Sequence, residues 1–227
     1  MVGDDAAMLD AREAFLAAGH YRPIADAATS LLSEAPGQRI LDVGCGTGYY
    51  LRHAVDRLPD AAALALDLSP VAVARATRGH DRIDGLVADV WSPLPVRDGA
   101  ATAILNVFAP RNPEEFRRVL GPGGSLVVVV PAADHLRELR GRGLVLGVQE
   151  EKRERLLAAL SPHFDLEREV AVERSLRLSA TAVEALVGMG PSAHHRDAAE
   201  AVRERETVVT TSVTALRFRR RDEVRPG

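Results

Sequence analysis

The chain has 227 residues, of which 46% are hydrophobic and 27% charged, and its formal net charge at pH 7 is -3. This length fits one domain, or one domain with a small appendage, and supplies enough apolar residues for a large core. The small negative charge argues against a protein that coats nucleic acid over its whole surface, although it leaves room for a local basic patch. Because Cys45 is the lone cysteine, a disulfide framework and a cysteine-histidine metal cluster are excluded.

The N-terminal part predicts two helices. Residues 3–18 carry apolar side chains at helical spacing, with Asp4 or Asp5 as the N-cap. The segment 19–23 breaks this helix, and its proline suits the first turn of a second helix that extends to about Glu34. The N-terminus does not resemble a signal peptide, and the longest apolar run, at 126–130, is far shorter than a membrane span. We therefore expect a cytoplasmic protein that does not enter the membrane.

The most informative stretch is 39–48, which reads Arg-Ile-Leu-Asp-Val-Gly-Cys-Gly-Thr-Gly. Its apolar residues predict a strand buried on both faces, and an amphipathic helix is predicted at 49–58. A glycine turn between a strand and a helix lets the backbone approach a ligand at the switch point of an open parallel sheet. The glycine spacing, G-x-G-x-G, differs from the G-x-G-x-x-G fingerprint of dinucleotide-binding proteins, and Asp42 precedes the first glycine by two residues.

Two further predicted strands end in an acidic residue. The strand at 62–67 ends in Asp67, which lies about 20 residues beyond the glycines, where a carboxylate can accept hydrogen bonds from a ribose diol. The strand at 83–88 is followed directly by Asp89. The alternative interpretation is an ordinary glycine turn with helix-capping aspartates.

The remaining elements alternate along the first 130 residues. They are a helix at 71–78 capped by Ser69, a strand at 100–108, a helix from its cap Asn112 to Leu120, a tight turn at 121–124 and a strand at 125–130. This alternation predicts an α/β fold with a doubly wound, mostly parallel sheet.

The second half is less regular. We expect a short helix with a loop at 134–148, helices at 149–160, 179–189 and 193–205, one or two strands at 164–178 and a final strand at 207–218. The last strands would pair as an antiparallel hairpin.

The loop motif, together with Asp42, Asp67 and Asp89, resembles the class I S-adenosylmethionine-dependent methyltransferases. The resemblance implies a seven-stranded Rossmann-like sheet, S-adenosyl-L-methionine as cofactor, S-adenosyl-L-homocysteine as product and no metal. It also implies that the loop passes under the methionine part of the cofactor and that the acidic residue of the motif faces the amino group. The cofactor-binding residues it implies are Asp42, Gly44, Cys45, Gly46, Gly48, Tyr49, Asp67, Leu68, Asp89, Val90 and Asn106.

Other stretches resemble one subfamily, the large-subunit ribosomal RNA guanine-N1 methyltransferases. They include Gly19-His20-Tyr21, Phe108-Ala109-Pro110 and the segments 131–139 and 189–193. The resemblance extends to about His195. That family carries an N-terminal zinc module that helps to grip RNA, whereas this chain begins where the module would already have ended and contains no zinc ligand set. Either the module has been removed or the protein naturally lacks it, and we expect the latter.

Without an RNA-gripping module, an acidic chain is a weak RNA binder. The first expectation is therefore a small nitrogen heteroaromatic acceptor. Shortened actinobacterial relatives of this kind resemble enzymes that methylate indole C3 of tryptophan-containing cyclic dipeptides, which then close to pyrroloindolines, and this resemblance implies a role in natural-product biosynthesis. Ribosomal RNA guanine-N1 methylation is the alternative, and it predicts a patch formed by Arg12, Arg22, Arg137, Arg140 and Arg142. A non-catalytic partner protein with the same fold is a second alternative, and the oligomeric state stays open.

The expected domain organisation is a helical cap at 1–36 and a methyltransferase domain at 37–227, with acceptor-covering insertions around 133–160 and 179–205. The candidate catalytic residues are Asn106, His20 and Tyr21. Asn106 could orient the acceptor or the cofactor, or simply bond to backbone at a strand end. Either His20 or His135 could act as a base because histidine titrates near neutral pH, or each could be structural. The candidate substrate-binding residues are Phe15, Tyr21, Phe108, His135, Met189, Ser192 and His194.

Overall fold

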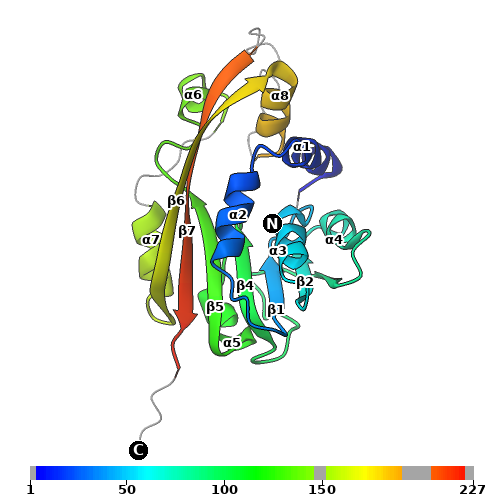
Figure 1. The fold of residues 1–227 in the computed structure, drawn as a ribbon, viewed down its shortest axis with the longest axis vertical. Helices are drawn as coiled ribbons and strands as arrows, with labels where there is room; N and C mark the ends of the chain where they lie inside the picture. The colour runs from blue at the N-terminus through cyan, green and yellow to red at the C-terminus, as the bar shows by residue number, and fades with distance from the viewer. Residues whose placement is uncertain (1–3, 146–151, 191–205, 223–227) are drawn as a thin grey trace, which may run out of the picture.

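The computed structural model describes residues 4–145, 152–190 and 206–222. Within these ranges the chain forms a seven-stranded sheet of order β3-β2-β1-β4-β5-β7-β6 (Figure 1). Strands β1 to β5 are parallel, and β7 pairs antiparallel with both β5 and β6. The strands are β1 Arg39–Val43, β2 Ala62–Asp67, β3 Ile83–Val87, β4 Ala101–Val107, β5 Leu120–Pro131, β6 Phe164–Ser179 and β7 Glu206–Arg220. The predicted doubly wound sheet and its antiparallel hairpin are confirmed.

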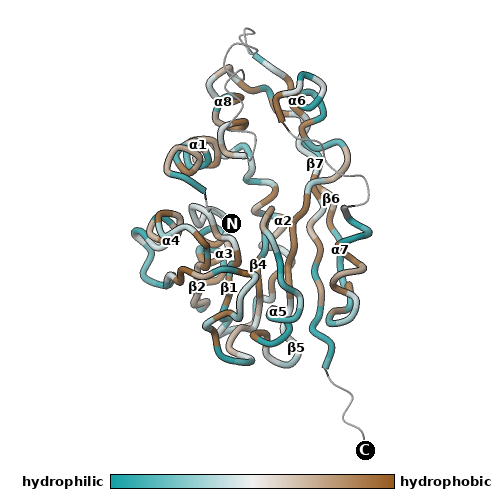
Figure 2. Tube along the Cα trace, turned by 180° about the vertical axis from the view of Figure 1, so that it is seen from behind, coloured by the Kyte–Doolittle hydropathy of each residue, from teal (hydrophilic) through white to brown (hydrophobic). Residues whose placement is uncertain are grey.

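Helices cover both faces of the sheet (Figure 1). One apolar cluster joins the sheet to α2, α3 and α8, and the other joins it to α5 and α7. Alternate residues of β1 enter different clusters: Ile40 lies in the first, and Leu41 in the second. The helices are α1 Ala6–Ala17, α2 Arg22–Ser30, α3 Tyr49–Arg57, α4 Pro70–Thr77, α5 Pro113–Val119, α6 Arg137–Gly141, α7 Lys152–Leu160 and α8 Ala180–Gly188. Figure 2 shows hydrophobic stretches along the central strands and hydrophilic stretches at the outer helices and loops.

Short polar side chains begin several helices, as the sequence predicts. Asp5 accepts a hydrogen bond from the Met8 amide at the start of α1. Ser69 at α4, Asn112 at α5 and Ser179 at α8 each accept from the amide three residues later. These caps satisfy amides that the first helical turn leaves without a partner, so they fix where each helix begins.

The structure differs from the sequence expectations at α2 and β5. Helix α2 ends at Ser30, earlier than expected. Of the one or two strands expected at 164–178, the structure forms one, β6, of 16 residues. The predicted turn at 121–124 falls inside the span of β5, where the pairing shifts from Ala101 with Leu120 to Ala103 with Ser125. The glycines therefore form an irregularity within the strand. The helix predicted at 193–205 lies outside the described residues, and no helix in the described ranges is long and apolar enough to cross a membrane.

The order of the strands creates a switch point between β1 and β4. The chain winds outward from β1 through β2 and β3 on one side, and through β4 and β5 on the other. In open parallel sheets, ligands bind in the crevice outside the carboxyl ends of the strands at such a point. The loop of Gly44 to Gly48 follows β1 at this edge.

Candidate active site

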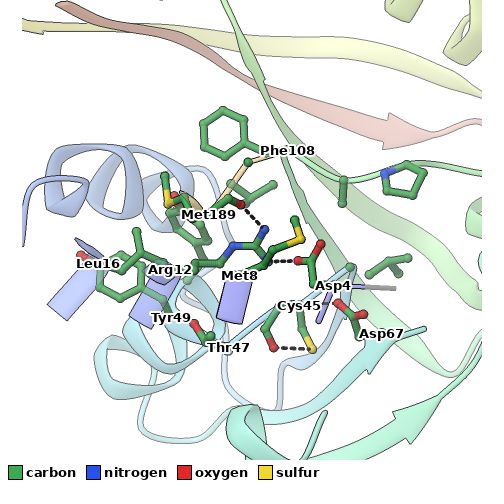
Figure 3. A pocket seen from close by; sticks show the side chains of 18 of the residues that line it. Asp4, Met8, Arg12, Leu16, Cys45, Thr47, Tyr49, Asp67, Phe108 and Met189 are labelled. Atoms are coloured by element: carbon green, nitrogen blue, oxygen red, sulfur yellow. Dashed lines mark hydrogen bonds and ion pairs between the residues drawn. The ribbon is translucent and has the colours of Figure 1, made fainter. Parts of the chain in front are cut away.

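A cavity of about 630 Å³ opens at the switch point. Its walls come from the glycine loop after β1, the ends of β2, β4 and β5, the inner face of α1 and the end of α8 (Figure 3). Most of the lining is apolar, and a few polar groups reach into it. This combination is typical of a small-molecule or cofactor site.

The glycine loop packs so tightly that side chains are excluded at its two ends. Gly44 has a φ of +78°, and a Cβ built there would lie 2.4 Å from the Cβ of Ala109. Gly48 has a φ of +77°, and its Cβ would lie 2.7 Å from the Cα of Ala76 in α4. The amides of Gly44 and Cys45 donate to the carbonyl oxygen of Leu66 at 2.8 and 3.0 Å, which holds the loop against β2. Only glycine permits this close packing, against the Ala109 side chain at Gly44 and against the α4 backbone at Gly48.

Asp67 and Asp89 line the cavity at the ends of neighbouring strands. Oδ2 of Asp67 accepts from the Gly46 amide and Oδ1 from the Ser69 amide, both at 2.9 Å. Oδ1 of Asp89 accepts from the Trp91 amide at 3.0 Å. Backbone amides therefore fix the position of both carboxylates, while each oxygen keeps a lone pair with which to accept from a ligand hydroxyl or amine.

Asp42 lies beneath the loop and is only 2% exposed. Its Oδ2 atom is buried without a hydrogen-bond partner. Burial, and to a smaller extent the charge of Asp67, raises the pKa of this carboxyl to about 8. A positively charged ligand beside the loop would favour the ionised form. S-adenosylmethionine carries a sulfonium and an ammonium group, so the buried carboxyl, the glycine cradle and the two strand-end carboxylates fit this cofactor.

An aromatic cluster occupies another part of the cavity wall. The ring centroid of Tyr21 lies 6.2 Å from that of Phe108 and 6.3 Å from that of His135. Phe108 and His135 stack with centroids 5.9 Å apart and an interplanar angle of 30°. Phe108 has a φ of +53° and is 40% exposed, although it is a large apolar residue. Such a strained and exposed aromatic side chain suggests a ligand contact.

The hydrogen bond of His135 bears on its predicted role as a base. Its Nδ1 atom accepts from the Ser212 amide at 3.2 Å. An accepting Nδ1 carries no proton, so the neutral ring carries its proton on Nε2. In this arrangement, Nε2 of the neutral His135 ring can donate a hydrogen bond but cannot accept one. The geometry thus favours a donor over a base.

The neighbouring aromatic residues at the N-terminal end differ in how close they come to the cavity. Tyr21 lines it, and burial raises the pKa of its hydroxyl well above the ordinary value, so the hydroxyl stays protonated. Phe15 packs edge-on behind Tyr21 at 5.0 Å, and His20 contacts Phe15 at 4.9 Å. Neither Phe15 nor His20 is part of the lining. His20 therefore does not reach the cavity lining, and its ring contacts Phe15 instead.

Asn106 is fully buried and bonded to backbone. Its Nδ2 atom donates to the carbonyl oxygens of Val43 at 3.0 Å and Pro110 at 2.9 Å, and its Oδ1 accepts from Nε of Arg111 at 3.3 Å. The side chain is not part of the lining. It ties the ends of β1 and β4 together, which is the alternative that the sequence offered for this residue.

The structure thus brings together most of the predicted residues, but not all of them. The predicted residues that line the cavity are Tyr21, Gly44, Cys45, Gly46, Tyr49, Asp67, Leu68, Asp89, Val90, Phe108, His135 and Met189. Those that lie behind the lining are Phe15, His20, Asp42, Gly48 and Asn106. Ser192 and His194 fall outside the described residues.

Sequence reasoning missed part of the wall that α1 contributes. Asp4, Met8 and Arg12 line the cavity, together with Leu186 and Val187 of α8. Arg12 was expected only in a surface patch. The i, i+4 spacing of Met8 and Arg12 places both on one helix face, but that spacing does not reveal what the face covers. Within the described ranges, no group of three His, Cys, Asp or Glu side chains could hold a metal ion.

Comparisons with known proteins agree with this geometry. Residues 40–124 match the family model described as a methyltransferase domain. A 23S rRNA (guanine(748)-N(1))-methyltransferase from Streptomyces fradiae is 44% identical over 207 residues, which cover 89% of this chain and 74% of that protein. A relative from Micromonospora griseorubida, with a provisional 23S rRNA (guanine-N(1)-)-methyltransferase name, is 41% identical over 239 residues. The match covers 96% of this chain and 81% of that protein.

A solved structure of geranyl diphosphate methyltransferase in complex with S-adenosylmethionine shares the fold. Its TM-score is 0.59 at 18% identity, and the match covers 97% of this chain and 96% of that one. At this identity the likeness concerns the fold alone. The sequence matches and the fold together show an S-adenosylmethionine-dependent methyltransferase. The chain belongs to the class I S-adenosylmethionine-dependent methyltransferases, and within them to the family that includes the 23S rRNA guanine-N1 methyltransferases.

Proposed function

We propose that this methyltransferase acts on N1 of a guanine in 23S rRNA, with the base seated against Phe108 and His135. The observation that carries the proposal is the aromatic cluster of Tyr21, Phe108 and His135 in the wall of the same cavity as the glycine loop. Flat faces of this kind stack on unpaired bases, which is how proteins commonly hold single-stranded RNA. The Streptomyces fradiae relative acts on a guanine N1 of 23S rRNA by its name, which supports the choice of acceptor.

The opposite part of the cavity would hold the cofactor. The loop Gly44 to Gly48 would face its methionine portion, and Asp67 with Leu68 and Asp89 with Val90 would face its ribose and adenine. S-adenosylmethionine supplies a methyl group that is already activated by the positive sulfur. The chain must therefore align the acceptor, exclude water and assist the loss of a proton.

His135 would assist the acceptor as a hydrogen-bond donor. Guanine N1 carries a proton that must leave, and the charge left behind is shared between N1 and O6. A hydrogen bond from Nε2 of His135 to O6 would stabilise that charge and ease the transfer of the N1 proton to water. The Ser212 amide, which donates to Nδ1, keeps the proton on Nε2. Phe108 would fix the plane of the base.

Indole C3 of a tryptophan-containing cyclic dipeptide is a second candidate acceptor, and one observation favours it. Among the described lining residues the carboxylates are Asp4, Asp67 and Asp89. Asp4 is paired with Arg12, and backbone amides hold the other two. None of the three therefore serves as an evident base at the aromatic cluster. Indole C3 attacks as an enamine and needs no base to remove a proton before the methyl group is transferred.

A methyl-transfer assay separates these acceptors. The enzyme would receive labelled S-adenosylmethionine with either 23S rRNA that lacks guanine-N1 methylation or tryptophan-containing cyclic dipeptides. We expect label in rRNA, identified as 1-methylguanosine after digestion, with activity that falls steeply as salt rises. Label on indole C3, located by NMR, would overturn the rRNA assignment and establish the second candidate. Absence of label on both, with S-adenosylhomocysteine still bound, would contradict both.

A further inference from the structure

Arg12 extends from α1 into the cavity, between the glycine loop and the end of α8 (Figure 3). Its Nη2 atom donates to the carbonyl oxygen of Met189 at 2.9 Å. Its Nη1 atom forms an ion pair with the carboxylate of Asp4, which also lines the cavity. Among the lining residues that the structure describes, Arg12 is the one arginine or lysine, so it supplies the fixed positive charge of this wall.

The guanidinium of Arg12 lies directly on the glycine loop. A Cβ built on Gly46 would come within 2.9 Å of its Nη1 atom and 3.6 Å of its Cδ atom. Oδ2 of Asp67 accepts from the amide of the same glycine at 2.9 Å, so the position of the loop beneath the guanidinium is fixed. A ligand group that rests on this part of the loop would therefore also meet Arg12.

The charges of the wall restrict what that group can be. The methionine portion of the cofactor ends in an α-carboxylate, which needs a positive partner once it leaves water. Asp4, Asp67 and Asp89 would repel it, whereas a guanidinium binds carboxylates with two parallel hydrogen bonds. We propose that Arg12 binds the α-carboxylate of S-adenosylmethionine, and that the carboxylate of Asp4 competes with it for the same guanidinium. The inference goes beyond the proposed acceptor and does not depend on it.

The competition would couple cofactor binding to the N-terminal segment. Oγ of Ser69, the cap of α4, donates to the backbone oxygen of Asp4 at 3.1 Å, so this segment lies beside the Asp67 end of the cavity. A cofactor carboxylate would displace the Asp4 side chain from Arg12, while the bond from Arg12 to Met189 can remain. Arg12 would then join α1, the cofactor and the end of α8.

Two ligands that differ in the amino-acid portion test this role without any turnover. S-adenosylhomocysteine carries the carboxylate, and 5′-methylthioadenosine lacks the amino-acid portion. By calorimetry we expect Arg12→Gln to weaken the binding of S-adenosylhomocysteine about 10- to 100-fold, which is the size expected for the loss of a charge-assisted hydrogen-bond pair. Its affinity for 5′-methylthioadenosine should change less than about twofold, because that ligand does not reach Arg12. Asp4→Asn should strengthen the binding of S-adenosylhomocysteine about three- to tenfold, because the competing charge is removed.

A matched control separates ligand binding from the anchoring of α1. Arg75 of α4 pairs with Asp10 at 2.6 Å and with Glu13 at 3.1 Å on the other side of α1, outside the cavity lining. Arg75→Gln loosens the same helix and should leave the affinity ratio of the two ligands unchanged. Equal losses for both ligands in Arg12→Gln, or none for S-adenosylhomocysteine, would overturn the proposal. An unchanged or weakened S-adenosylhomocysteine affinity in Asp4→Asn would overturn the competition.

A conservative variant covers the case in which Arg12→Gln does not fold. Arg12→Lys keeps the charge but cannot make the paired hydrogen bonds. We expect an intermediate loss, confined to S-adenosylhomocysteine. A loss of the same size for 5′-methylthioadenosine would mean that Arg12 acts only on the structure of α1, and this would contradict the inference.

Discussion

The glycine-loop end of the cavity and its aromatic end are built in different ways. The glycine-loop end consists of backbone held at close range: Gly44 and Gly48 leave no room for a side chain, and the carboxylate of Asp67 is fixed by two amides. The aromatic end consists of side chains from distant segments, namely Tyr21, Phe108 and His135. The glycine-loop end is thus set by main-chain geometry, whereas single substitutions can change the shape of the aromatic end.

The difference predicts that substitutions can alter the two ends of the cavity separately. Replacing Phe108 or His135 changes shape and hydrogen bonding without moving the sheet, since these side chains extend from its edge into the cavity. A Cβ at Gly44 would instead collide with Ala109, and a Cβ at Gly48 with the backbone of α4. Changes at the two ends should therefore have separable effects on cofactor affinity and on acceptor use.

The largest effect is expected from Gly48→Ala. A Cβ at this position would lie 2.7 Å from the Cα of Ala76, and the residue has a φ of +77°, which strains any side chain. Gly79 has a φ of +73°, and a Cβ at that position would have nothing within 4 Å, so Gly79→Ala isolates the backbone strain. We expect Gly79→Ala to cost about 1 kcal/mol of unfolding free energy and Gly48→Ala at least about 2 kcal/mol more, measured by denaturant unfolding. Equal costs would show that the loop can move away from α4.

Asp42→Asn should change how the unfolding free energy of the chain depends on pH. The pKa of Asp42 is about 8 in the folded chain and near 3.8, its ordinary value, when unfolded. The folded state therefore binds the extra proton between these values, and the stability it confers is complete below about pH 4 and is lost as the pH rises through 8. Relative to Asp42→Asn, we expect the wild type to lose about 2 kcal/mol or more of unfolding free energy from pH 5 to pH 9.

A difference between wild type and Asp42→Asn that stays constant over this range would contradict the raised pKa of Asp42. Saturating S-adenosylmethionine should shift the loss toward lower pH, because its positive charges favour the ionised carboxyl. S-adenosylhomocysteine, which lacks the sulfonium charge, should shift it less. Comparison of the two ligands separates the effect of charge from the effect of filling the cavity.

Phe108→Ala tests the aromatic end. Loss of stacking on an aromatic ring should lower kcat/KM for the acceptor roughly 5- to 150-fold, which corresponds to about 1 to 3 kcal/mol of transition-state stabilisation. The affinity for S-adenosylhomocysteine should stay within about twofold, since this residue is not needed at the cofactor end. Trp91 is 54% exposed and is not part of the lining, so Trp91→Ala is the aromatic control. Parallel losses in both variants would mean that Phe108 has no specific role.

The smallest effect on stability is expected from Arg137→Gln. Arg137 lies at the start of α6, half exposed, and pairs with Glu138 at 3.2 Å and Asp134 at 3.7 Å. Exposed pairs of this kind contribute about 0.2 to 1 kcal/mol. If rRNA is the acceptor, the substitution should raise the KM for rRNA and reduce its dependence on salt. An unchanged salt dependence would show that Arg137 does not contact the RNA.

The sequence is informative where the cause of structure is local. The strand at 39–43, the glycine turn and the helix caps follow from neighbouring residues, so their positions are predicted closely. The role of Asn106 is not predictable from the sequence, because a strand-end amide can face a ligand or the backbone. In the structure its side chain donates to the carbonyls of Val43 and Pro110, which assigns it to the backbone.

The sequence predicts a helical cap at 1–36, but not which side chains of α1 reach the cavity, because that depends on packing between distant segments. Helical spacing identifies the face that carries Met8 and Arg12, but the neighbours of that face are the glycine loop and the end of α8, far along the chain. The role of His135 has the same origin. Its donor state depends on the amide of Ser212, 77 residues away.

The most direct test of the central claim, that one cavity holds the cofactor at the glycine loop and the acceptor at the aromatic cluster, is a crystal structure with S-adenosylhomocysteine. We expect the ribose to lie against Asp67, the adenine beside Asp89 and Val90, and the sulfur to face the cluster of Tyr21, Phe108 and His135. A cofactor whose sulfur faces away from that cluster would contradict the assignment of the two ends.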